Sequence, residues 1–195
     1  MATLRYFAGP MGAGKSTLAL QMEHNYLAAG RVGVLLSCRD RGGEAVVSSR
    51  LGLTRDAVEI GADTDVFDLV CARVGSGGFV IADEAQFYSP AQVDQLARLV
   101  DEHGVDVDCF GILTDFASHL FPGSRRLVEL ADAFCRLQLE VLCWCGAPGQ
   151  QNARVENGRV THEGQQVLVG DTDATAEVRY VVLCRHHWRT RTLGA

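Results

Sequence analysis

The sequence lacks the features of a membrane-bound or exported protein. It contains no apolar run approaching the roughly 20 residues that a membrane-spanning helix needs, which excludes an integral membrane protein. Its first residues, Met1 to Tyr6, do not form the basic segment followed by an apolar one that marks a secretory signal. We therefore expect a cytoplasmic protein with no membrane partner.

Basic residues are also scarce. Lys and Arg number 18 against 24 Asp and Glu, so the formal net charge is −6. Proteins that hold nucleic acid mainly by electrostatic attraction need clustered cations, so we expect no nucleic-acid partner, although a local basic patch is allowed. The remaining composition, 47% hydrophobic and 22% charged, is ordinary for a globular protein with a sizeable core.

The first part of the chain alternates between short apolar runs and helical patterns. The apolar runs, which predict strands, cover residues 3–8, 32–36, 79–82 and 105–113. The spacing of apolar residues predicts helices over 16–29 and 90–102, the second capped by Ser89. Apolar strands separated by helices predict an α/β fold, in which a parallel sheet is covered on both faces.

The composition changes after about Leu139. Cys143-Trp144-Cys145-Gly146 opens a stretch rich in Gly, Gln, Asn and Thr, without a long helical pattern. Short β-like pieces follow at 159–161, 166–169 and 181–183. We therefore predict two domains, an α/β domain over residues 1–140 and a smaller one over residues 141–195.

The phosphate-binding pattern G-x-x-x-x-G-K-[ST] is matched in full by Gly9-Pro10-Met11-Gly12-Ala13-Gly14-Lys15-Ser16. It lies between an apolar run and an amphipathic helix, as the pattern requires. The glycines let backbone N–H groups turn toward phosphate oxygens, Lys15 would neutralise the β- and γ-phosphates, and Ser16 would ligate Mg²⁺. The alternative is a glycine-rich turn without a ligand. The predicted ATP-binding residues are Gly9, Met11, Gly12, Ala13, Gly14, Lys15, Ser16 and Thr17.

Two adjacent carboxylates, Asp83 and Glu84, follow the apolar run at 79–82. Phosphate-loop proteins place a second Mg²⁺-holding carboxylate at such a strand end, and α/β folds form their ligand sites there. We assign Asp83 to nucleotide-bound Mg²⁺. Glu84 points elsewhere and is free to act as a base. A solvated acidic loop is the competing interpretation.

Cysteine and histidine occur in two short pairs near the C-terminus. Cys143 and Cys145 form the first pair, and Cys184 and His187 form the second after a long β-like excursion. Two short ligand pairs separated by a loop are typical of structural zinc sites. We predict that these four side chains bind Zn²⁺, with His186 as an alternative to His187. Ordinary burial of the cysteines is the competing interpretation.

Several short motifs follow one another along the chain in a fixed order. They are the phosphate loop 9–17, Asp83-Glu84-Ala85-Gln86-Phe87, Thr114-Asp115-Phe116, Leu120-Phe121-Pro122-Gly123-Ser124, the two cysteine pairs, and Tyr180 just before Cys184-Arg185. This ordered set, which covers nearly the whole chain, resembles the zinc-containing type II thymidine kinase family. The resemblance implies a RecA-like P-loop domain and a small zinc domain whose lasso-shaped loop covers the nucleoside.

The resemblance also implies a function. The protein would phosphorylate the 5′-hydroxyl of thymidine, and of deoxyuridine, with ATP in DNA precursor salvage, as a homotetramer inhibited by thymidine triphosphate. Glu84 would be the general base for the 5′-hydroxyl. The residues implied around the nucleoside are Met11, Phe87, Ile112, Phe116 and Phe121 as walls of the thymine pocket, with Tyr180 of the lasso beside them.

The chain departs from the family pattern at three places. Ala117-Ser118 stand where many members have Arg-Gly, which removes a basic group. Asp40 and Arg41 are adjacent where the family has Asp-x-Arg, and the segment 170–180 is longer than usual.

Two other functional classes share some of these features. A nucleic-acid-stimulated ATPase would fit the helicase-like Asp83-Glu84-Ala85-Gln86, but the short chain and the net charge of −6 disfavour it. A non-enzymatic zinc-ribbon module with a nucleotide switch would leave Glu84 and the aromatic residues without a purpose. Phosphate transfer to free thymidine, with no polynucleotide present, would distinguish the three.

Overall fold

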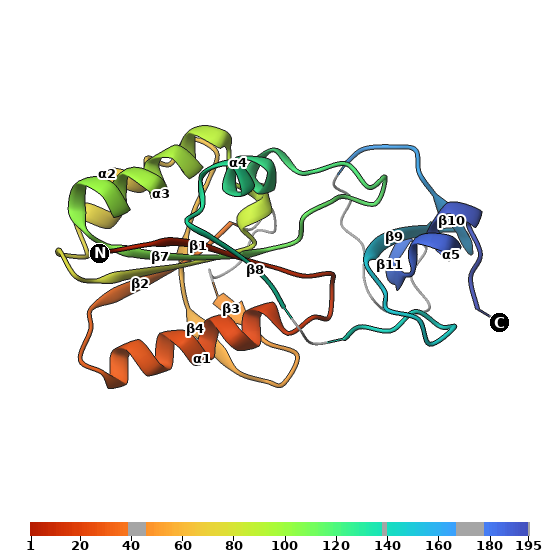
Figure 1. Ribbon diagram of the computed structural model, residues 1–195, viewed down its shortest axis with the longest axis horizontal. Coiled ribbons are helices and arrows are strands. Elements are labelled where there is room, and N and C mark those ends of the chain that lie inside the picture. Colours follow the sequence, from red (N-terminus) through yellow and green to blue (C-terminus); the bar gives the residue numbers. More distant parts are fainter. Residues whose placement is uncertain (39–45, 138–139, 167–177, 195) are drawn as a thin grey trace.

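A six-stranded parallel sheet forms the centre of the protein (Figure 1). The structure, a computed structural model, describes residues 1–38, 46–137, 140–166 and 178–194. The strand order is β5-β2-β6-β7-β1-β8. The strands are β1 (Leu4–Ala8), β2 (Gly33–Ser37), β5 (Val58–Glu59), β6 (Phe79–Asp83), β7 (Asp106–Gly111) and β8 (Ala133–Arg136). The predicted α/β fold is confirmed.

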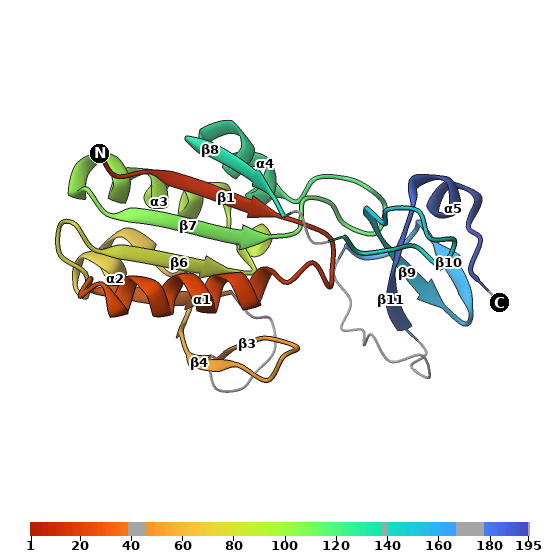
Figure 2. The same cartoon turned by 60° about the horizontal axis from the view of Figure 1, so that its bottom comes forward.

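Helices cover both faces of this sheet, as Figures 1 and 2 show. One face carries α1 (Lys15–Ala28), and the other carries α2 (Val66–Cys71), α3 (Pro90–His103) and α4 (Pro122–Leu130). All five residues of β6 are buried between the two layers, which explains the apolar run that precedes Asp83. Ser89 caps α3 as predicted, and its backbone N–H is in turn bound by the side chain of Gln92.

A small hairpin lies beside α1 and was not predicted. It consists of β3 (Val46–Ser48) and β4 (Thr54–Asp56), which pair antiparallel. Val47 is fully buried against side chains of α1 and the sheet, whereas the residues of β4 are exposed. Asp40 and Arg41, where the sequence departs from the Asp-x-Arg pattern of the family, lie outside the described residues.

A second, antiparallel sheet lies beyond the carboxyl ends of the parallel strands (Figures 1 and 2). Its order is β10-β9-β11, with β9 (Gln151–Glu156), β10 (Arg159–Thr161) and β11 (Val178–Leu183), and the short helix α5 (Arg185–Thr190) follows. Its core is small. The buried apolar residues are Cys143, Ala153, Val155, Val160 and Leu183. The predicted strand at 166–169 falls outside the described residues from position 167 onward.

None of the described helices combines the length and the apolar character that crossing a membrane would require.

Candidate active site

The predicted phosphate loop forms the turn between β1 and α1. Gly12 and Gly14 have φ of +80° and +74°, a conformation that favours glycine and turns the backbone around the loop. The Nζ of Lys15 donates to the carbonyl oxygens of Gly9 at 3.1 Å and Pro10 at 2.9 Å. The ammonium group is therefore held inside the turn by the carbonyl groups of the loop itself.

The carboxylate of Asp83 reaches this loop from the end of β6. Its Oδ2 accepts a hydrogen bond from the hydroxyl of Ser16 at 3.0 Å. Burial, together with the neighbouring charge of Glu84, raises the pKa of Asp83 to about 6. Burial also lowers the pKa of Lys15, a shift that both carboxylates oppose. The structure thus brings the predicted cation, hydroxyl and two carboxylates together at one edge of the sheet.

Glu84 is held in an unusual backbone conformation. Its φ of 52° lies in the left-handed region, which a non-glycine residue adopts at a cost of about 1–3 kcal/mol. The side-chain amide of Gln86 donates a hydrogen bond to the Glu84 carboxylate, and Oε1 of Gln86 accepts one from the backbone N–H of Ile112 at 3.1 Å. Gln86 lies in the short 3₁₀ helix η1 (Ala85–Phe87), so it joins Glu84 to the residue that directly follows β7. Its bridging role was not predicted.

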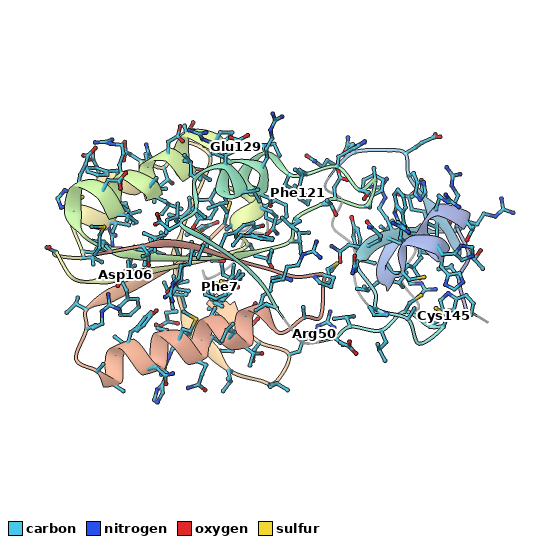
Figure 3. All side chains as sticks on the ribbon, in the orientation of Figure 1. Phe7, Arg50, Asp106, Phe121, Glu129 and Cys145 are labelled. Atoms are coloured by element: carbon cyan, nitrogen blue, oxygen red, sulfur yellow. The ribbon has the colours of Figure 1, made fainter. Side chains whose placement is uncertain are left out.

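Two of the predicted pocket aromatics contact each other beside Glu84. The rings of Phe87 and Phe121 meet edge to face, with centroids 5.6 Å apart. The start of α4 comes very close to η1, since a Cβ atom on Gly123 would lie 2.5 Å from the carbonyl oxygen of Tyr88. Glycine is therefore required at this position. Figure 3 shows Phe121 at the end of the parallel sheet that faces the second sheet.

Phe116 is buried and is held by residues of the second sheet and of α5. The Arg154 guanidinium lies over its ring at 3.7 Å from the centroid, and the indole N–H of Trp188 donates to its carbonyl oxygen at 2.9 Å. Tyr180 pairs with Arg154 across β11 and β9, so both side chains share one face of the sheet. Neither Arg154 nor Trp188 stands in a motif that would have identified it from the sequence.

Met11 is held by the same sheet. Its backbone N–H donates to Oδ1 of the buried Asn152, on β9, at 2.8 Å. Where Ala117-Ser118 depart from the family pattern, the hydroxyl of Ser118 donates to Oε1 of Gln151 at 2.9 Å. The second sheet therefore contacts both the phosphate loop and the segment after β7.

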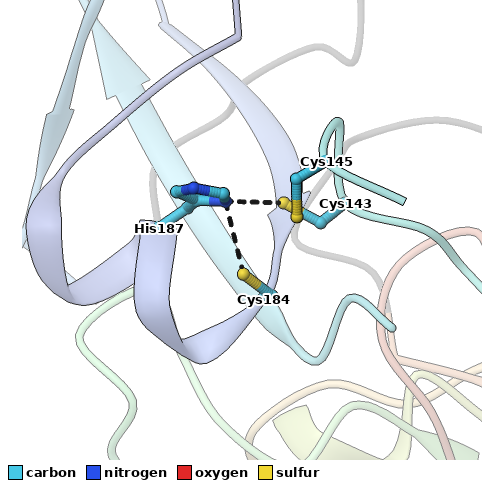
Figure 4. Close-up of side chains that lie close together, drawn as sticks. All are labelled: Cys143, Cys145, Cys184 and His187. Carbon is cyan, nitrogen blue, oxygen red and sulfur yellow. Dashed lines mark hydrogen bonds between the residues drawn. The ribbon is translucent and has the colours of Figure 1, made fainter. Parts of the chain in front are cut away.

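Three thiols and one imidazole gather where β11 leads into α5 (Figure 4). The ligand atoms of Cys143, Cys145, Cys184 and His187 all lie within 4.8 Å of one another. The Nδ1 of His187 is 3.4 Å from the sulfur of Cys143 and 3.3 Å from that of Cys184. His186 is exposed and lies outside the cluster.

The donor set fits zinc. Ligands about 2.0–2.3 Å from a tetrahedral Zn²⁺ stand roughly 3.5–3.8 Å apart, close to the 3.4 and 3.3 Å between His187 Nδ1 and the sulfurs of Cys143 and Cys184. Burial would raise the pKa of the Cys143 thiol, but the backbone N–H groups of Cys145 and Cys184 and the side chain of His187 lower it to about 6. A thiol that ionises so readily is prepared to bind a metal.

The parallel sheet, with a glycine-rich turn and paired carboxylates at the ends of its strands, defines a class, that of open α/β proteins that form their ligand sites at this edge of the sheet. The family model described as "Thymidine kinase" matches residues 2–188. The chain belongs to the thymidine kinase family.

Full-length relatives agree with this assignment. The thymidine kinase of Streptomyces coelicolor is 54% identical, over 100% of this chain and 92% of that protein. That of Cutibacterium acnes is 49% identical, over 100% and 91%. That of Rhizobium etli is 38% identical, over 100% and 97%.

Proposed function

We propose that the protein transfers the γ-phosphoryl group of ATP to the 5′-hydroxyl of thymidine, and also of deoxyuridine, in DNA precursor salvage. The observation that carries the proposal is the bridge made by Gln86 between the Glu84 carboxylate and the backbone of Ile112. It ties a candidate base to a candidate wall of the nucleoside pocket. A hydroxyl bound there would have a proton acceptor and the phosphate loop close at hand.

The phosphate loop and its neighbours would hold the donor. Backbone N–H groups of the phosphate loop would surround the phosphates, and Lys15 would exchange its present carbonyl partners for phosphate oxygens. Ser16 and Asp83, already in contact, would hold Mg²⁺. When bound, this ion neutralises part of the phosphate charge.

Glu84 would act as the general base. The 5′-hydroxyl oxygen attacks the γ-phosphorus as its proton passes to the Glu84 carboxylate. The bond from the γ-phosphorus to the β–γ bridging oxygen breaks, and ADP leaves. Phosphoryl transfer leaves little covalent work to the protein, so positioning and charge stabilisation supply most of the acceleration. A positioned base contributes roughly 10²–10⁴-fold.

The thymine ring would pack among apolar and aromatic side chains. A planar base favours such walls combined with a few fixed hydrogen bonds. Arg154 and Trp188 hold Phe116 from the second sheet. The side chains proposed for the pocket are Met11, Phe87, Ile112, Phe116, Phe121 and Tyr180.

The cysteine cluster would hold a structural zinc ion. Four protein ligands, from Cys143, Cys145, Cys184 and His187, would leave no open position for a reacting water or substrate. We propose that residues 1–140 and 141–195 are separate domains, the second stabilised by this metal. Membership of the family also supports a cytoplasmic homotetramer that thymidine triphosphate inhibits.

The test is a panel of acceptors incubated with γ-labelled ATP and Mg²⁺. The panel holds thymidine, deoxyuridine, deoxycytidine, deoxyadenosine and single-stranded DNA. We expect label on thymidine and deoxyuridine without any polynucleotide. Release of labelled phosphate that depends on DNA, with no labelled nucleoside, would instead support an ATPase and contradict the proposal.

A further inference from the structure

An arginine that belongs to none of the sequence motifs faces the phosphate loop. Arg50 lies in the turn between β3 and β4, and its Nη1 is 3.5 Å from the position that a Cβ atom on Gly12 would take. Gly12 belongs to the same loop as Lys15. In Figure 3 Arg50 lies near the start of α1, on the side of the parallel sheet that faces the second sheet.

The hairpin that carries Arg50 is fixed against α1. Val47 is fully buried in the apolar cluster between α1 and the sheet, and Arg55 forms an ion pair with Glu23 of α1 at 3.5 Å. The turn is closed by a hydrogen bond from the backbone N–H of Ser49 to the carbonyl oxygen of Leu53 at 2.8 Å. Figure 2 shows the hairpin running alongside α1. The position of Arg50 therefore follows from packing.

The charge of Arg50 is not neutralised within the described part of the chain, where no carboxylate forms an ion pair with it. Other exposed arginines do find such partners, as Arg98 does with Glu102 at 2.9 Å. Burial is the main cause that lowers the pKa of Lys15, and the positive charge of Arg50 acts in the same direction. Two cations beside a loop of N–H donors repel each other unless an anion lies between them.

We propose that Arg50 is a phosphate-binding residue whose guanidinium contacts the terminal phosphates of the bound nucleoside triphosphate, alongside Lys15. The inference rests on the proposed function, because it assumes that a triphosphate occupies the loop. A guanidinium presents paired N–H donors that match phosphate oxygens. Its exposure leaves the side chain free to turn toward them.

The test compares Arg50→Ala and Arg50→Lys with the wild type by measuring dissociation constants for ATP, ADP and AMP without thymidine. A hydrogen bond to a charged group contributes enough to change affinity by roughly 10- to 100-fold. We expect Arg50→Ala to weaken ATP binding by that factor, ADP binding by less, and AMP binding by under about twofold. Arg50→Lys should retain part of the affinity, since it keeps the charge.

Arg98→Ala is the matched control, because it removes an exposed arginine from α3, which covers the other face of the parallel sheet from α1. It should bind all three nucleotides as the wild type does. The inference is overturned if Arg50→Ala binds ATP within twofold of the wild type, if AMP weakens as much as ATP, or if Arg98→Ala shows the same loss. Thermal melting of each variant identifies any loss of affinity that is caused by unfolding. If Arg50→Ala is unfolded, the ATP affinity of Arg50→Lys, which preserves the side-chain bulk, provides the test in its place.

Together with the acceptor panel, these affinities separate the two proposals. If the wild type phosphorylates no nucleoside but Arg50→Ala loses ATP affinity, the proposed function fails and the assignment of Arg50 stands. If the wild type phosphorylates thymidine but Arg50→Ala binds ATP normally, only the assignment of Arg50 fails.

Discussion

Replacing Cys184 with serine should remove the metal and weaken thymidine binding more than ATP binding. The second sheet has a core of only a few buried apolar residues. A metal that joins the chain segments before and after the sheet should therefore supply much of the stability of this domain. Cys184 directly precedes α5, the helix that carries His187 and Trp188. Loss of the metal should therefore release the contacts that this sheet and helix make with Phe116.

The size of the effect follows from those contacts. The hydrogen bond from Trp188 to Phe116 contributes about 1 kcal/mol, and the Arg154 guanidinium over the Phe116 ring contributes about 1–2 kcal/mol. Losing both would weaken thymidine binding by up to roughly 30- to 150-fold. The phosphate loop would lose only the bond from Met11 to Asn152, about 1 kcal/mol or roughly fivefold in ATP affinity.

The assay combines metal analysis with calorimetric titration of thymidine and of a non-hydrolysable ATP analogue. Cys71→Ser is the matched control, because Cys71 is half-buried and lies outside the cluster. It should keep its zinc and both affinities. Full zinc occupancy in Cys184→Ser, or unchanged thymidine affinity after the metal is lost, would refute the reasoning.

Three smaller predictions follow from single contacts. Trp188→Phe should keep its zinc but bind thymidine about fivefold more weakly, since it loses the hydrogen bond to the Phe116 carbonyl while keeping an aromatic ring beside His162; titration showing no change would contradict this. Asn152→Ala leaves the Met11 N–H unpaired and should destabilise the protein by about 1–3 kcal/mol in urea unfolding; unchanged stability would count against the contact. Tyr6→Phe should lower the free energy of unfolding most below pH 10. Burial raises the pKa of Tyr6 in the folded protein, so the wild type loses stability as the pH rises above the tyrosine pKa of the unfolded chain, about 10. Above that pH the stability difference between wild type and variant should shrink by about 1.4 kcal/mol per pH unit, and a constant difference from pH 8 to 11 would refute this coupling of Tyr6 ionisation to stability.

Much of the central fold could be predicted because its signals are local. The strands β1, β2, β6 and β7 consist mostly of apolar residues, and the Ser89 cap marks the start of α3. The edge strand β8 was missed because its residues alternate between half-buried and exposed, and the hairpin because the residues of β4 are exposed. Neither produces an apolar run.

The candidate site was predicted only where a motif marks it. The phosphate loop, Asp83 and the cysteine pairs have fixed spacings that chemistry imposes. The contacts of Arg154 and Asn152 join strands that are far apart in sequence from Phe116 and Met11, so no local pattern reveals them. The left-handed backbone of Glu84 likewise has no signature in the sequence.

The central claim is that Glu84 accepts the proton of a nucleoside hydroxyl during phosphoryl transfer. The most direct measurement is the single-turnover rate of thymidine monophosphate formation by Glu84→Gln, with ATP affinity measured alongside. The amide keeps the shape of the side chain but cannot take up the proton, so the rate should fall by roughly 10²–10⁴-fold while ATP still binds. A rate near that of the wild type would contradict the account.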